Sequence, residues 1–194
     1  MTTGNAPMSR EALAFLQRRV ALFGLWNFVA GAFFLVARLG MEQVEGHGLS
    51  QVVTWLSHGL GVCLFGVMRL LTRRGERSVA FVHAVEAIGL VGGLGAYAAM
   101  GALMPASVRP DFIVLLALSN GMVVRSVVVP STARRTLALS VPLTVPVLAV
   151  AYLHAPAIGA AWSDALAAST PDNAVVLEQY RRVSVGWAGA WWSM

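Results

Sequence analysis

The sequence contains no lysine, and only 12% of its 194 residues are charged, about half of the roughly 25% found in typical globular chains. So little charge cannot cover the surface of a soluble domain of this length. Instead, 57% of the residues are hydrophobic, and long uncharged stretches recur from one end of the chain to the other. The composition therefore predicts a polytopic membrane protein whose main partner is the lipid bilayer.

Cysteine is also scarce, since Cys63 is the only one and lies inside an apolar run. A single cysteine excludes an internal disulfide, and in lipid a lone thiol acts as a small hydrophobe. The sequence has no P-loop, no zinc-protease or serine-hydrolase motif, no paired aspartates for diphosphate substrates and no kinase motif. We therefore expect that this chain alone is not an enzyme. The scattered histidines lack the spacing of a metal site, so we expect no metal or other cofactor.

The positive charge is carried entirely by arginine, with 14 arginines against 9 acidic residues and a net charge of +5. These arginines form short clusters between apolar runs and do not spread over one basic face. We therefore expect no nucleic-acid partner and interpret the clusters as signals of membrane topology.

Five apolar segments are long enough to cross a bilayer, which needs roughly 20 helical residues. They cover residues 20–38, 50–70, 79–103, 112–130 and 137–155. Because lipid offers no partners for backbone N–H and C=O groups, we expect helices, and the segments lack the alternation of a membrane barrel. The predicted fold class is an all-α transmembrane bundle, with a membrane domain over 20–155 after a cytoplasmic segment over 1–19.

The C-terminal part predicts a polar connection and then the start of a sixth helix. Residues 156–182 contain turn-forming residues and are expected to form an extracytoplasmic loop. Residues 183–194 are apolar and rich in tryptophan, but they are too few to cross the hydrocarbon layer. We expect a truncated sixth helix here; the alternative is an aromatic anchor at the membrane surface.

The distribution of arginines predicts the orientation. If the N-terminus is cytoplasmic, ten arginines fall inside and four outside, in agreement with the positive-inside rule. The inner ones are Arg10, Arg18, Arg19, Arg69, Arg73, Arg74, Arg77, Arg125, Arg134 and Arg135, and the outer ones are Arg38, Arg109, Arg181 and Arg182. We therefore expect a multi-pass protein of the cell inner membrane with a cytoplasmic N-terminus.

Ionisable residues inside membrane segments are costly and indicate candidate functional sites. Glu86 lies in the third segment with His83 three residues before it, and Arg125 lies at a comparable depth in the fourth. Consecutive helices are antiparallel, so we expect Glu86 and Arg125 to form an ion pair, with His83 as a proton-sensitive neighbour. The alternative is that Arg125 extends to the headgroups and Glu86 is protonated or exposed to water.

Two further segments carry residues that shape helix packing. Gly89 and Gly93 form a small-x-x-x-small pair, which supports either a homodimer through the membrane helices or a contact within the chain. Pro142 and Pro146 are expected to bend the fifth helix, either as a hinge or as ordinary membrane prolines.

The stretch V-V-V-P-S-T-A-R-R-T-L-A-L-S, residues 127–140, is the most distinctive in the chain. Pro130 is expected to end one helix, and Ser131 or Thr132 to cap the next. Arg134 and Arg135 would then anchor the chain at the cytoplasmic surface.

This stretch resembles the loop between the fourth and fifth membrane helices in the sensor region of large serine/threonine protein kinases of myxobacteria. The early R-R-V-A-L-F (18–23), Glu86 and the tryptophan-rich 183–194 agree with the same family. The resemblance implies a sensor or anchor module with six helices in its complete form and a kinase domain beyond them. No catalytic residue is carried over, because the positions that would bear them are absent from this sequence, which we expect to stop within the sixth helix as a truncated product would.

The leading hypothesis is therefore a non-catalytic membrane sensor or anchor module that works through changes in helix packing. The alternative is a small transporter or channel in which Glu86, His83 and Arg125 line a polar path. Such proteins are typically built from internal repeats or discontinuous helices, and the sequence shows neither.

Overall fold

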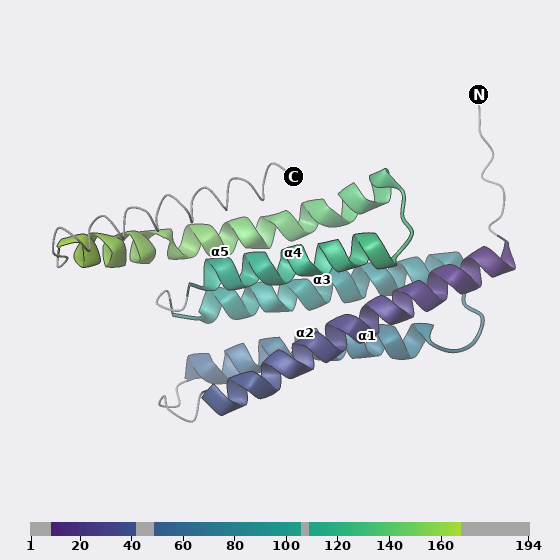
Figure 1. Cartoon of the computed structure of the whole chain (residues 1–194), viewed down its shortest axis with the longest axis horizontal. Helices are drawn as coiled ribbons and strands as arrows, with labels where there is room; N and C mark the ends of the chain where they lie inside the picture. The colour runs from purple at the N-terminus through teal and green to yellow at the C-terminus, as the bar shows by residue number, and fades with distance from the viewer. Residues whose placement is uncertain (1–8, 42–48, 106–108, 168–194) are drawn as a thin grey trace. The chain divides into compact units, whose positions relative to one another are not determined.

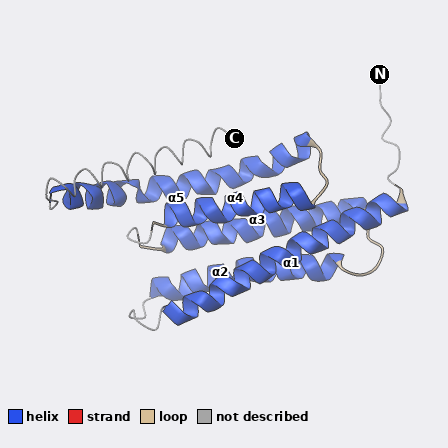
Figure 2. Cartoon of the chain, viewed as in Figure 1, coloured by secondary structure: helices blue, strands red, loops and turns tan. Residues whose placement is uncertain are grey.

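The computed structural model describes residues 9–41, 49–105 and 109–167. Within these ranges the regular structure is entirely helical and contains no strand (Figure 2). The prediction of an all-α chain is therefore confirmed for the described residues. The expected sixth segment, 183–194, and most of the connection before it lie outside them.

Five helices follow one another in chain order: α1 (Arg10–Met41), α2 (Leu49–Thr72), α3 (Val79–Leu103), α4 (Pro110–Val128) and α5 (Ala133–Ala167). Each contains a stretch long and apolar enough to cross a membrane, namely Arg10–Ala37, Gln51–Thr72, Val79–Leu103, Pro110–Val128 and Ala133–Ala160. Many large apolar side chains on these stretches face outward, as they do on helices that contact lipid. Length, composition and exposure are together those of a membrane protein.

Helix α1 starts earlier than the sequence predicts. The expected boundary was residue 20, but the helix begins at Arg10, where the Ser9 hydroxyl accepts a hydrogen bond from the backbone N–H of Ala12 at 3.2 Å. A serine cap followed by Glu11 is a favourable helix start. Much of the segment 1–19, expected to precede the first membrane helix, is therefore helical and continuous with it.

Helix α5 continues further than the sequence predicts. The expected helix ended at residue 155, whereas α5 runs to Ala167 through the first part of the expected loop 156–182. This part is rich in alanine, the best helix former, which outweighs the turn tendency of Pro156. Pro142 and Pro146 lie inside the helix, which is not interrupted at either position.

The chain divides into two compact units, residues up to His154 and residues from Ala155 onward. In the second unit, the described residues are the last turns of α5. The first unit holds α1 to α4 and most of α5. Figure 1 shows that the start of α1, the α2–α3 turn and the α4–α5 turn lie at one end of this first unit, as successive antiparallel helices require.

Helices α1, α2 and α3 pack closely because glycines lie where they meet. A Cβ atom added at Gly24 of α1 would lie 3.0 Å from the backbone nitrogen of Arg69 in α2. On α3, Gly89 is covered by the Met68 side chain, and a Cβ added at Gly93 would lie 2.6 Å from Cε2 of Phe65. The Gly89–Gly93 face is thus occupied by α2 of the same chain, which agrees with the expected alternative of a contact within the chain.

Candidate functional site

The charged residues of the candidate site are held on α3, α4 and α5 by well-defined helix ends. Ser78 caps α3 by accepting a hydrogen bond from the N–H of Phe81, and Glu86 follows two turns into the helix. Helix α4 ends at Val128, one turn after Arg125, and Pro130 stops its continuation. Both charged residues therefore lie near the end of the first unit where α3 starts and α4 finishes.

Glu86 and Arg125 form an ion pair in the interior of the bundle. Arg125 Nε donates to Glu86 Oε1 at 2.8 Å, and neither side chain has any exposed surface. Glu86 shares its helix face with fully buried Val82 and Leu90, so the pair lies among apolar side chains. The arrangement agrees with the expected ion pair and not with an arginine that extends to the headgroups.

The remaining nitrogens of Arg125 bind the start of α5 and the turn before it. One terminal nitrogen donates to Thr136 Oγ1 at 3.2 Å, and the other donates to Ser131 Oγ at 3.1 Å. A buried guanidinium needs partners for its donors, and here they come from three segments of the chain. Arg125 therefore connects α3, the α4–α5 turn and α5.

Arg135 of α5 is a second cation at the same carboxylate. One of its terminal nitrogens lies 2.5 Å from Glu86 Oε2 and also 3.2 Å from the carbonyl oxygen of His83. The other lies 2.6 Å from His83 Nδ1. Glu86 thus binds one guanidinium through each oxygen, and His83 joins the cluster through Arg135 and not through Glu86 directly.

The sequence predicts a cytoplasmic anchor formed by Arg134 and Arg135 but does not predict that Arg135 binds Glu86. Arg134 is exposed, whereas the Arg135 side chain is only 24% exposed because it turns toward Glu86. Helical periodicity would have identified it, since Arg135 lies four and eight residues before the buried Leu139 and Leu143. An arginine on the buried stripe of a membrane helix requires an acidic partner.

The two polar residues of the α4–α5 turn have different tasks. Thr132 Oγ1 accepts a hydrogen bond from the backbone N–H of Arg135 at 3.3 Å and so caps α5. Ser131, the other expected cap, accepts from Arg125. The 127–140 element and the intramembrane residues, two separate candidates in the sequence, therefore belong to one cluster, which we call the junction cluster: His83, Glu86, Arg125, Ser131, Thr132, Arg135 and Thr136.

The junction cluster has one carboxylate and two guanidiniums, so it carries an excess of positive charge while His83 is neutral. Charge–charge interactions are strong where water is excluded, and removal of one member leaves an uncompensated charge. Such a cluster can hold three helices in one arrangement that depends on its charge state. Among the residues that the structure describes, no group of three or more His, Cys, Asp or Glu side chains could hold a metal ion.

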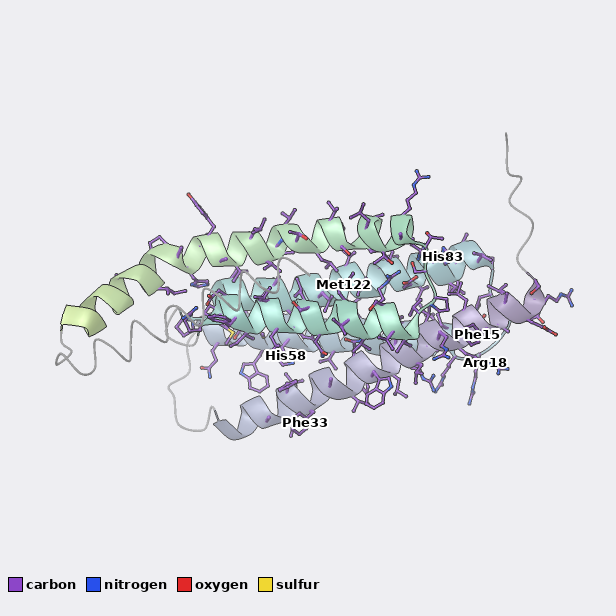
Figure 3. The ribbon with its side chains drawn as sticks, turned by 45° about the horizontal axis from the view of Figure 1, so that its top comes forward. Phe15, Arg18, Phe33, His58, His83 and Met122 are labelled. Atoms are coloured by element: carbon purple, nitrogen blue, oxygen red, sulfur yellow. The ribbon has the colours of Figure 1, made fainter. Side chains whose placement is uncertain are left out.

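Two further histidines connect helices elsewhere in the first unit. His58 Nε2 of α2 lies 3.1 Å from the carbonyl oxygen of Gly31 in α1, and His154 Nε2 of α5 lies 3.1 Å from that of Gly101 in α3. Both side chains are buried. Figure 3 shows His83 toward the end of the bundle that carries Phe15 and Arg18, with His58 further along it.

The fold and the site together define a class: a membrane protein of apolar helices with a buried charge cluster where α3, α4 and α5 meet. In comparisons with protein-family models, with curated proteins and with solved structures, nothing matched this chain. Its function is therefore argued from the junction cluster itself.

Proposed function

We propose that this chain is a membrane sensor or anchor module, similar to the membrane region of bacterial serine/threonine kinases, and that it does not itself carry out catalysis. It lies in the cell inner membrane with its N-terminus in the cytoplasm. The observation that carries the proposal is the junction cluster, in which the buried Glu86 links Arg125 of α4 and Arg135 of α5 to α3. A cluster in which one carboxylate is shared by two guanidiniums favours discrete packing arrangements over gradual deformation.

The mechanism follows from the position of the cluster in the chain. Arg125 reaches both Ser131 and Thr136, so a shift of α4 changes the start of α5 directly. Helix α5 then carries the change toward the residues that follow it. A stimulus that alters the charge or the packing at the junction would thus alter the arrangement of α5.

The geometry argues against the rival function, a transporter or channel with a polar path through Glu86. A path for ions or protons needs water or free acceptors, whereas both oxygens of the buried Glu86 are bonded to guanidiniums. Proteoliposomes with purified protein give the test. Proton flux that disappears in Glu86→Gln but persists in the surface variant Arg134→Gln would favour the transporter and contradict the sensor.

The kinase-related role is tested by reading the genomic DNA after codon 194 in all three frames. We expect it to encode a kinase glycine loop, H-R-D and D-F-G motifs. Downstream DNA that encodes none of these motifs would contradict the relation to kinases.

A further inference from the structure

The three histidines among the described residues differ in the direction of their hydrogen bonds. The partners of His58 and His154 are backbone carbonyl oxygens, which only accept, so each Nε2 must donate. The partner of His83 Nδ1 is a guanidinium nitrogen of Arg135, which only donates. His83 Nδ1 must therefore accept, and it can do so only while it carries no proton.

A proton has opposite consequences for these two kinds of bond. A protonated imidazole donates from both nitrogens, so His58 and His154 keep their bonds to the carbonyls. His83 loses its bond, because two donors then face each other across 2.6 Å. Of the three, only the His83 bond is broken by the addition of a proton.

We propose that His83 is a proton-operated latch between α3 and α5, which holds Arg135 while Nδ1 is free and releases it when Nδ1 binds a proton. The inference deepens the proposed sensor function by naming protons as the stimulus, and it rests on that function. The latch belongs to the cytoplasmic end of the bundle, so it would respond to cytoplasmic pH.

The charges around His83 make the release more than the loss of one hydrogen bond. The groups that act on the ring are Glu86 of its own helix, Arg125 of α4 and Arg135 of α5. While the ring is neutral, the Glu86 carboxylate balances the charge of two cations, Arg125 and Arg135. If the ring were protonated, the same carboxylate would face three cations. Arg135 is the one that can leave, because its side chain is 24% exposed while that of Arg125 is fully buried.

The ring that would bind the proton is not sealed inside the bundle. His83 is only partly buried and lies one turn into α3, close to the exposed α2–α3 turn. Figure 3 shows it near the end of the bundle where α1 begins. Since Arg135 lies in the first turn of α5, its release frees the start of that helix, while the Glu86–Arg125 pair keeps α3 and α4 together.

The test measures the separation of α3 and α5 as the pH changes. The full chain, with Cys63→Ser, receives spin labels through Ala80→Cys on α3 and Ala138→Cys on α5, two exposed positions, and is placed in lipid nanodiscs. Distances are recorded by electron spin resonance from about pH 8 to about pH 4.5, on both sides of the ordinary imidazole pKa of about 6.5. We expect the distance distribution to shift or broaden as the pH falls.

Two histidine variants decide whether His83 is responsible. In His83→Gln, whose amide oxygen accepts from Arg135 but cannot bind a proton, the distribution should stay at its neutral-pH form throughout. In His154→Gln, the matched control at the other end of the bundle, the response to pH should persist. If His83→Gln does not fold, Arg135→Met removes the other half of the latch and should also abolish the response.

A distribution that does not change with pH, or that still changes in His83→Gln or Arg135→Met, would overturn the latch. This result leaves the sensor proposal intact, because that proposal requires the Glu86 bonds to Arg125 and Arg135 but no proton at His83, and its relation to kinases is tested separately by the DNA downstream of codon 194. Conversely, the absence of a kinase downstream leaves the distance measurement unaffected.

Discussion

Arg125 and Glu86 lie on consecutive helices, 39 residues apart in sequence, and their Nε and Oε1 atoms are 2.8 Å apart with both side chains fully buried. The antiparallel arrangement of α3 and α4 places the second turn of one helix beside the last turns of the other. Two residues that are each unfavourable in lipid therefore compensate each other.

Loss of Glu86 should destabilise the protein more than loss of Arg125. Glu86→Gln leaves two guanidiniums facing each other, and we expect it to lower the free energy of unfolding by about 3–5 kcal/mol. Arg125→Gln should cost less, because Glu86 keeps its bond to Arg135. Thermal and denaturant unfolding in detergent measure both changes. Arg134→Gln, which alters an exposed arginine, should stay within about 0.5 kcal/mol of the parent protein.

If Glu86→Gln and Arg125→Gln both unfolded like the parent protein, the buried ion pair would not contribute to stability. The reverse order of the two effects would show instead that Arg135 does not share the Glu86 carboxylate.

The face of α3 that contacts α2 should not tolerate a side chain at Gly93. An added Cβ would lie 2.6 Å from Phe65 Cε2, so Gly93→Ala should lower stability by about 1–3 kcal/mol. Gly95→Ala provides the matched control on the same helix, because no atom lies within 4 Å of the added Cβ. It should be neutral or stabilising by up to about 1 kcal/mol, since alanine favours helix. Equal effects of the two variants in thermal unfolding would contradict the packing of α3 on α2.

Gln17 should matter more than an ordinary polar residue in a membrane helix. Its Nε2 donates to the carbonyl oxygens of Thr72 at 3.0 Å and Gly75 at 2.7 Å, which joins α1 to the end of α2. Gln17→Met removes both hydrogen bonds and should cost about 1–3 kcal/mol. Gln17→Glu should cost more, because a carboxylate would face the two carbonyl oxygens. Unfolding in detergent that ranks Gln17→Glu as the milder change would show that the amide does not donate to these carbonyls.

The proposed cytoplasmic location of the N-terminus predicts which exposed positions react from each side. In a Cys63→Ser background, a thiol introduced by Glu76→Cys in the α2–α3 turn should be protected from a membrane-impermeant reagent added outside intact spheroplasts. A thiol introduced by Pro105→Cys after α3 should react at once. Residues 76 and 105 are both exposed, but they lie at opposite ends of α3 and therefore on opposite sides of the membrane. Labelling in the reverse order would invert the proposed orientation.

Much of the fold was predictable because the hydrophobic segments are separated by short charged turns. The expected bounds of the third helix, 79–103, agree with α3, and those of the second and fourth differ from α2 and α4 by about two residues. The largest errors lie at the start of α1 and at the end of α5. Polar residues in α1 and alanine-rich residues in α5 extend these helices there without adding to their apolar runs. Hydropathy predicts which residues can lie in lipid, but it does not predict where a helix begins or ends.

The candidate site was predictable in part for a similar reason. Glu86 and Arg125 are conspicuous because each is a charge inside an apolar run. Arg135 is not conspicuous in the sequence, because it follows Arg134 at a helix start. A pair of arginines at such a position normally indicates the membrane surface. Its role depends on which face of α5 turns toward α3, and that is decided by packing.

The order of residues in the junction cluster also affects how the protein is made. Glu86 leaves the ribosome 39 residues before Arg125, which at roughly 5–20 residues per second is a delay of roughly 2–8 s. During this interval α3 has no cationic partner from α4 or α5 for its carboxylate. Glu86 therefore stays without its ion-pair partners until α4 and the start of α5 have been synthesised, so the final arrangement of α3 cannot form before then.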